Sequence, residues 1–152
     1  MANGQLNGTD LSVYITPSGG SATLIAYATN ATININHSTR GTTNKESGAW
    51  EEHMEGLRSW DISCDALYAY LDASGGAIGG LTLSELFTDM IHTRAKLDVT
   101  FGTTGSTSGD TKYTGSVWVT SASLTAPLED TATFSVSFQG SGALTQTIDT
   151  TP

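Results

Sequence analysis

Cysteine, cations and long apolar runs are scarce in this chain, and each shortage excludes a class of protein. The single cysteine, Cys64, cannot form an internal disulfide and has no partner cysteines for a zinc cluster, so we expect it to be a small buried residue. No run approaches the roughly 18 apolar residues of a transmembrane helix, which argues against membrane insertion. The N-terminus MANGQLNGTDL lacks the basic and apolar segments of a signal peptide, so synthesis in a cytoplasm is expected.

The charge is strongly one-sided. Six Lys and Arg stand against fifteen Asp and Glu, which gives a formal net charge of −9. Tight binding of nucleic acid needs clustered cations that displace counterions from phosphates, and these six are few and scattered. The simplest interpretation is solubility, because a net charge away from zero keeps copies apart. The alternative is the wall of a pore along which DNA slides without binding.

Alternation of apolar and polar residues with period two dominates the sequence, which predicts a mainly β fold. The clearest segment is 131–139, where Phe134, Val136 and Phe138 alternate with Thr and Ser. Further strands are predicted at 11–16, 22–29, 31–36, 57–68, 94–101 and 113–126. The strands are expected to form one domain, 1–152, as an antiparallel β-sandwich or barrel-like fold with one dry and one wet face per sheet.

Large aromatic and acidic side chains are assigned to different surfaces of these strands. Aromatic rings in strands contribute the most buried area, so four of them are predicted core or subunit-interface anchors. They are Trp60, Trp118, Phe134 and Phe138. Three acids, Asp61, Asp65 and Asp98, are candidates for the wet face or for the lumen of such a pore.

One helix is expected to flank the strands, at about 82–93. Thr82 and Glu85 form a capping box, in which the hydroxyl and the carboxylate each satisfy an exposed backbone N–H. Apolar residues then recur at helical spacing and predict a narrow stripe that packs against the sheet. The stripe consists of Leu83, Leu86, Phe87, Met90 and Ile91.

No arrangement of residues predicts catalysis, a metal or a cofactor. The three histidines lie far apart and form no zinc motif, and no GxSxG elbow is present. Glu51, Glu52 and Glu55 could serve acid–base chemistry, but their polar surroundings favour a solvated or intersubunit salt-bridging segment. Asp61 and Asp65 could help to bind calcium, yet no calcium-binding loop surrounds them.

The segment 37–56 has no alternating pattern and is predicted to be a long loop. Trp50 lies within it, and an aromatic in a long polar loop is either a local staple or an anchor for a partner. The end of the chain, 145–152, is predicted to be a flexible tail. We hypothesise that 38–55 and 145–152 are both disordered in the free subunit and become ordered on assembly.

Three segments stand out in combination: ESGAWEEHMEGLRSWDISCDALY, KYTGSVWVTS and LEDTATFSVSFQGSGAL. Together they resemble the major tail tube protein of long-tailed, siphovirus-like bacteriophages, the TP901-1-like and lambda-like tail tube family, over about 11–144. The resemblance implies a β-sandwich with one flanking helix, six copies of which form a ring. Stacked rings would form the tube through which DNA leaves the virion. The glycine-rich region 73–80 departs from the family pattern.

The resemblance also implies partners and contact residues. The subunit would bind copies of itself, a tape-measure protein, a tail-tip or initiator complex and a tail terminator, while DNA would pass through the lumen without specific binding. It would be made in the host bacterial cytoplasm and reside in the virion tail. Contacts between rings would come from Arg40, Lys45, Glu46, Trp50, Glu51, Glu52 and Glu55.

Two other classes of protein remain as alternatives. A secreted or surface-displayed β-sandwich could act as an adhesin or carbohydrate-binding module, although the missing signal peptide argues against it. Glycan binding by the monomer would support that alternative. A small enzyme would need a catalytic constellation that the sequence does not offer.

Overall fold

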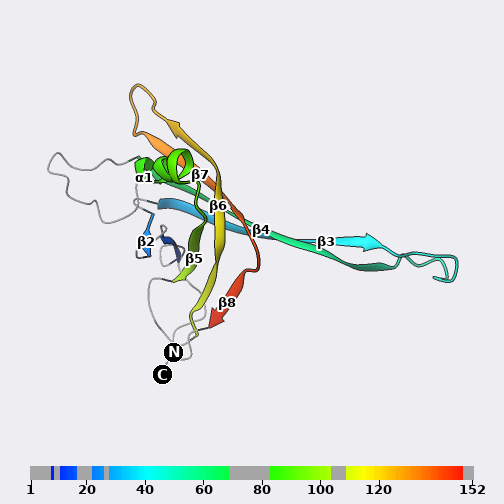
Figure 1. Ribbon diagram of the computed structural model, residues 1–152. Helices are drawn as coiled ribbons and strands as arrows, with labels where there is room; N and C mark the ends of the chain where they lie inside the picture. The colour runs from blue at the N-terminus through cyan, green and yellow to red at the C-terminus, as the bar shows by residue number, and fades with distance from the viewer. Residues whose placement is uncertain are drawn as a thin grey trace.

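The computed structural model describes residue 8 and residues 11–16, 22–25, 28–68, 83–103 and 109–148. Within these ranges, eight strands, one short helix and a π-helical turn follow along the chain (Figure 1). In order they are β1 (Leu11–Thr16), β2 (Thr23–Leu24), β3 (Ala28–Gly41), β4 (His53–Leu67), α1 (Leu83–Thr88), η2 (Asp89–Thr93), β5 (Leu97–Thr103), β6 (Thr111–Thr125), β7 (Thr133–Gly140) and β8 (Thr145–Ile148). The mainly β, antiparallel fold with one flanking helix that the sequence predicts is confirmed.

The strands form one continuous antiparallel sheet in the order β2-β1-β5-β6-β7-β4-β3, with β8 also paired to β6. β6 joins the two halves of this sheet. It pairs with β5 from Lys112 to Val117, and on its other edge with β8 and then with β7 from Val117 to Thr125. Because buried residues of β1 and β5 belong to the same core as those of β4 and β7, the two halves fold over one another as the layers of a sandwich do.

The core lies between these two layers. Alternate residues of four strands point into it, as the period of two requires, and the helix contributes Leu86. The core side chains are Val13, Ile15, Ile25, Trp60, Ile62, Cys64, Ala66, Leu86, Leu97, Val99, Phe101, Val117, Phe134, Val136 and Phe138. Cys64 is buried, and this burial, with the charge of Asp65 beside it, raises the pKa of the thiol to about 12.

Trp60 occupies a space that two glycines provide. A Cβ atom built on Gly115 would lie 2.5 Å from the Trp60 ring, and one on Gly140 would lie closer still. The indole Nε1 donates a hydrogen bond to the backbone oxygen of Gly142 at 3.0 Å, so its polar edge is satisfied. The Gln139 side chain donates to the backbone oxygen of Trp60 at 2.9 Å. The ring is therefore fixed by both packing and hydrogen bonding.

Several predicted strand boundaries are wrong. The predicted strand 22–29 falls on parts of two strands, because β2 spans Thr23–Leu24 and β3 begins at Ala28, while residues 26 and 27 lie outside the described residues. β6 contains a register shift between Val119 and Ser121, and such a bulge inverts the alternation of side chains. Val119 before the bulge therefore packs on the core together with Ala122 after it.

The predicted flexible tail 145–152 is wrong for its first part. Thr145–Ile148 forms β8, which pairs with the start of β6 from Thr111 to Thr114. The polar sequence TQTI gave no apolar alternation, because all four of its side chains are exposed. Residues 149–152 lie outside the described residues.

The predicted helical segment 82–93 is confirmed over 83–93, but its winding changes along the segment. α1 ends at Thr88, and the next five residues form the π-helical turn η2. Leu86 is buried and Phe87 packs on the core, but Ile91 is 66% exposed because the wider turn shifts the apolar stripe out of phase. Thr82 and the side chains of Leu83 and Glu85, which include the predicted capping box, lie outside what the structure describes, as does the region 73–80.

Candidate assembly surfaces

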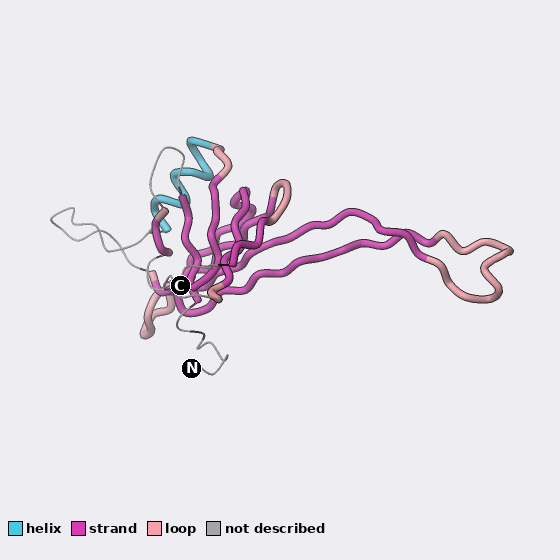
Figure 2. The backbone as a smooth tube through the Cα atoms, turned by 90° about the horizontal axis from the view of Figure 1, so that it is seen from below, coloured by secondary structure: helices cyan, strands magenta, loops and turns pink. Residues whose placement is uncertain are grey.

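β3 and β4 extend far beyond the rest of the sheet. β4 pairs with β7 only from Asp61 to Leu67, whereas its pairing with β3 continues to His53 opposite Gly41. Residues 36–59, which we call the arm, thus form a two-stranded ribbon that projects from the body in both views (Figures 1 and 2). The predicted loop 37–56 is therefore wrong at both ends, since only 42–52 lies outside the strands.

A bulge shapes the base of the arm. His37 pairs with Arg58 and Thr39 with Glu55, so β4 has one residue more than β3 between these pairs. The extra residue places Gly56 against Ser38, where a Cβ atom would lie 2.6 Å from the Ser38 backbone oxygen. The Ser38 hydroxyl donates to the backbone oxygen of Leu57 at 3.0 Å. Bulges of this kind bend and twist a ribbon, which sets the direction of the arm.

Three charged or titratable side chains meet beside this bulge. Arg58 forms an ion pair with Glu55, and the His37 Nε2 atom lies 3.5 Å from the same carboxylate. The hydrogen bond from Arg58 and then its charge hold the pKa of Glu55 below its ordinary value. Sequence reasoning assigned Glu55 to contacts between rings, but within the chain its carboxylate already has these two neighbours.

The tip of the arm, residues 42–52, is organised by its own hydrogen bonds. The Thr42 N–H donates to the Glu52 oxygen at 2.8 Å, and the Glu52 N–H donates to the Thr43 hydroxyl at 3.0 Å. The Ser47 N–H donates to the Asn44 oxygen at 3.2 Å. Gly48 and Ala49 follow with φ of 59° and 69°, a left-handed pair that reverses the chain.

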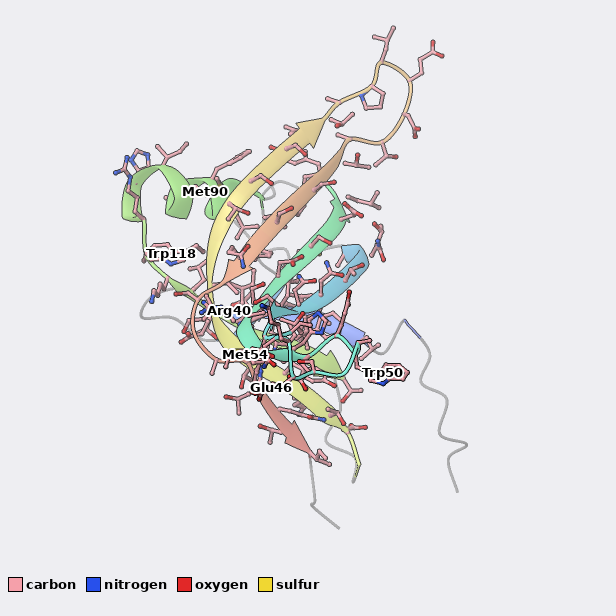
Figure 3. All side chains as sticks on the ribbon, turned by 90° about the vertical axis from the view of Figure 1, so that its right-hand side faces the viewer. Arg40, Glu46, Trp50, Met54, Met90 and Trp118 are labelled. Atoms are coloured by element: carbon pink, nitrogen blue, oxygen red, sulfur yellow. The ribbon has the colours of Figure 1, made fainter. Side chains whose placement is uncertain are left out.

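This turn presents Trp50 to solvent. Its backbone N–H is bound to the Ser47 oxygen at 3.1 Å, while its side chain is 80% exposed and points away from the ribbon (Figure 3). Arg40 and Met54 form a cross-strand pair behind the tip, and Met54 is 54% exposed. The tip also carries four exposed charged residues, which are Lys45, Glu46, Glu51 and Glu52. The chain thus places an indole and several carboxylates at the end of the projecting ribbon, exposed to solvent.

A second surface is the outward side of β3, β4, β7 and the adjoining part of β6, which we call the polar face. Its rows follow from the register, for example Thr32, Ser63, Ser137 and Ser121 side by side. The other members are Asn30, Asn34, Asp61, Asp65, Ser123, Ser135 and Gln139. No cation is among these residues, so the face combines hydroxyls, amides and carboxylates.

Hydrogen bonds across strands hold the two acids of the polar face. Asn34 Nδ2 donates to Asp61 at 2.8 Å, and the Ser135 hydroxyl donates to Asp65 at 2.6 Å. The third predicted acid, Asp98, lies on β5 outside this group of strands. It accepts a hydrogen bond from the Ser116 hydroxyl at 2.7 Å.

In the described part of the chain, no group of three or more His, Cys, Asp or Glu could hold a metal ion. Among the same residues, no helix has the length and apolarity to cross a membrane.

The family model for phage tail tube proteins matches residues 5–146. The chain belongs to the phage tail tube protein family. The match spans nearly all of the chain, including the arm and the polar face, so the resemblance found in three short segments extends to the whole pattern. As a tail tube protein, the chain is a structural, tube-forming component of a virion. A search of curated proteins found no match.

Solved structures share the fold of this tail tube protein. The tail of an empty gene transfer agent particle, refined with C6 symmetry, has a TM-score of 0.73 at 22% identity over 94% of this chain and 99% of that chain. The SPP1 tail tube has a TM-score of 0.72 at 12% identity, over 97% of this chain and 81% of that one. A chain of the anti-feeding prophage baseplate has a TM-score of 0.65 at 7% identity, with 97% of each chain covered.

Trp118 lies on the outside of the tail tube protein. It is 40% exposed and therefore not part of the core, unlike Trp60, Phe134 and Phe138. Because Val117 points inward, the next residue, Trp118, points outward, and it pairs with Gln139 at the β6 border of the polar face. The ammonium of Lys96 lies 5.8 Å from the ring centroid, a cation–π distance. Sequence reasoning missed Lys96 and its neighbour Arg94, because the predicted strand 94–101 included them as ordinary wet-face residues.

The titration of Glu55 tests the ion pair at the base of the arm. We expect its carboxyl to titrate below its ordinary value of 4.5 in nuclear magnetic resonance spectra, and the Arg58→Gln variant to move the midpoint back toward 4.5. Because the folded pKa is lowered, the pair supports the arm above about 4.5 and loses this contribution as the pH falls through the lowered value. Arg40→Gln, on the same arm, is the control and should leave the midpoint in place. An unchanged midpoint in Arg58→Gln would contradict the assignment.

Proposed function

We propose that this tail tube protein assembles with copies of itself into six-membered rings, and that the rings stack into a tube through which DNA passes. The arm is the observation that carries the proposal. It is a long ribbon exposed on both faces, and its ordered tip holds Trp50 at 80% exposure. An exposed two-stranded ribbon gains little stability from its own chain, so we expect a contact with another copy to stabilise it. The C6 symmetry of the similar gene transfer agent tail supports rings of six.

Contacts between rings come from the tip of the arm. Lys45, Glu46, Trp50, Glu51 and Glu52 are exposed there, with Arg40 behind them on β3, and the indole offers the largest apolar area to a partner. Glu55 acts indirectly, because it is paired with Arg58 and holds the arm base.

Contacts within a ring come from the edges of the sheet. β3 is the last strand in the sheet order and, among the described residues, its outer edge has no strand beside it. An exposed edge of this length invites pairing with another chain, and a closed ring of subunits removes the edge from solvent. Phe134 and Phe138, like Trp60, are buried in the subunit, so their rings are not available to a neighbour in the ring.

The polar face lines the lumen of the tube. Its Ser, Thr and Asn side chains keep the wall wet, and Asp61 and Asp65 repel phosphate, so the rows on β3, β4 and β7 offer DNA no cation that would retain it. Six copies carry a formal charge of −54, six times the −9 of one chain. The role of the protein is therefore physical and not enzymatic, and it needs no cofactor.

Assembly of such a tube needs further partners. A tail-tip or initiator complex would begin the tube, a tape-measure protein would set its length and a tail terminator would end it. The subunit would be made in the host bacterial cytoplasm and reside in the virion tail.

Negative-stain electron microscopy of the concentrated protein, paired with size-exclusion chromatography, tests the proposal. Rings or hollow tubes with six-fold end views are the expected result. A protein that stays monomeric even after tail-tip and tape-measure partners are added would overturn it, and end views with another symmetry would overturn the six-membered ring.

A further inference from the structure

We infer that the tip of the arm binds a second copy of this chain at a surface formed by Arg94, Lys96 and Trp118, which we call the basic patch. The inference rests on the proposed function, in which arms join neighbouring subunits. The basic patch is the surface of one subunit that accepts the tip of another.

The tip is acidic and aromatic. Residues 42–52 contain one lysine and three glutamates, a formal charge of −2, together with the exposed Trp50. Within the described chain, Glu46, Glu51 and Glu52 form no ion pair, since both ion pairs involve Glu55. The carboxylates of the tip are therefore free to meet cations of another molecule.

The basic patch has the complementary chemistry. Arg94 and Lys96 are exposed in the short segment between η2 and β5, and in the described structure neither forms an ion pair. Lys96 lies over the ring of Trp118, which is 40% exposed. An indole with one cation over its ring, and a second cation two residues earlier in the chain, offers an apolar contact to Trp50 and charge-assisted hydrogen bonds to the glutamates.

The distribution of cations makes the basic patch unusual in this chain. Of six Lys and Arg, the arm holds Arg40, Lys45 and Arg58, and Lys112 is half-buried on β6. The remaining two are Arg94 and Lys96. A chain with a net charge of −9 repels its own copies, so the surface that accepts an acidic tip must be locally positive.

Other exposed apolar surfaces fit the tip less well. Leu128, in the turn between β6 and β7, is 99% exposed but is followed by Glu129 and Asp130, which would repel it. A cavity beside Trp60 is lined by Ile35, Tyr113 and Leu144, and its one charged lining residue, Arg58, is already paired with Glu55. The basic patch alone joins an exposed ring with unpaired cations among these surfaces.

The contact also explains open-ended growth. The arm projects away from the body, whereas α1 and Trp118 belong to the body, so tip and patch are different surfaces of one subunit (Figures 1 and 3). A contact between two different surfaces of identical subunits leaves an unused tip and an unused patch at the ends of the assembly. Each added layer therefore recreates the site for the next one.

Charge reversal on both sides tests the pairing. We expect the double variant Glu51→Lys/Glu52→Lys to raise the protein concentration needed for tubes at least about tenfold, and Arg94→Glu/Lys96→Glu to do the same. The variant that carries all four changes should again form tubes near the wild-type concentration, because opposite charges face each other once more. Glu129→Lys/Asp130→Lys, at the other exposed turn, is the matched control and should assemble as the wild type does.

Cross-linking gives an independent measurement. Glu51→Cys with Lys96→Cys, assembled and then oxidised, should yield a ladder of disulfide-linked chains, while either single variant should not. Since Cys64 is buried, it does not interfere. Two results would overturn the basic patch as acceptor: the four-fold variant remains as defective as the double variants, or no ladder forms from assembled tubes. Neither result contradicts the proposed function. The proposed function is contradicted if the wild-type protein makes no tube.

Discussion

Shortening the arm is expected to abolish tubes and leave the subunit folded. In the variant, residues 43–51 are replaced by Asn-Gly, so that Thr42 and Glu52 flank a two-residue turn of the kind that suits a twisted hairpin. The hydrogen bonds of the tip all lie within 42–52, so the body loses no contact, whereas the partner contacts of Trp50 and the glutamates disappear. Electron microscopy should show no tubes, and circular dichroism should show an unchanged melting temperature within a few degrees.

A substitution of Trp50 alone tests whether its side chain, and not only the length of the arm, is needed for assembly. Trp50→Ala should raise the concentration needed for assembly by about tenfold to a hundredfold, the loss expected for an aromatic hot spot worth roughly 2 kcal/mol or more. Leu128→Ala is the matched control, because Leu128 is even more exposed but lies on a different turn. If the variant that lacks residues 43–51 formed tubes normally, the arm would have no role in assembly.

The ordered arm changes the expected control of assembly. The sequence suggested a segment 38–55 that is disordered until rings stack, but strands continue to Gly41 and resume at His53, and the tip has internal hydrogen bonds. The binding surface is therefore formed before assembly. We therefore expect charge repulsion between acidic copies to restrain polymerisation of the free subunit, and this restraint to weaken as salt is added.

The body of the fold could be predicted because its strands bury one face. Phe134, Val136 and Phe138 alternate with polar residues and all three lie in the core, as the period of two demands. The same period of two puts Ile62 and Cys64 in the core, on the side of β4 opposite to Asp61 and Asp65. These strands carry apolar signals because water is excluded from one side.

The arm could not be predicted by that logic. Solvent reaches both faces of residues 37–41 and 53–58, so neither face selects apolar side chains and no alternation exists to detect. Gly56 was the only local signal, since a glycine within a strand often marks a bulge or a close approach. β8 was missed for the same reason. In β6, the register shift at Thr120 reverses which residues face the core, so one alternating pattern does not run through the whole strand.

The assembly surfaces were only partly visible in the sequence. Trp50 was singled out because an aromatic in a polar segment needs a partner, and its exposure agrees with that argument. Trp118 looked equivalent to Trp60 because both occupy strands. What separates them is the partner strand: Trp60 lies over Gly115 and Gly140, while Trp118 points outward beneath Lys96. Which strand lies beside each tryptophan decides whether its ring is buried, and the order of residues in the sequence does not reveal that pairing.

Gly140→Ala is expected to destabilise the subunit strongly, and only while Trp60 is present. The new Cβ atom would fall inside the contact radius of the Trp60 ring, whose position is held by its hydrogen bond to Gly142. Overpacking of this kind typically costs about 1–3 kcal/mol. Loss of the ring itself in Trp60→Ala should cost roughly 3–5 kcal/mol, a large share of the stability of a typical domain.

The double variant Trp60→Ala/Gly140→Ala decides the mechanism. With the ring removed, the added methyl group has room, so the second change should cost close to nothing and the two single effects should not add. Urea unfolding of the dilute monomer, followed by circular dichroism, measures all three variants. Gly41→Ala is the control, because a Cβ atom there meets no atom within 4 Å and stability should stay nearly constant. If the effects of Trp60→Ala and Gly140→Ala were simply additive, the glycine would be required for its backbone freedom and not for the space it leaves to the ring.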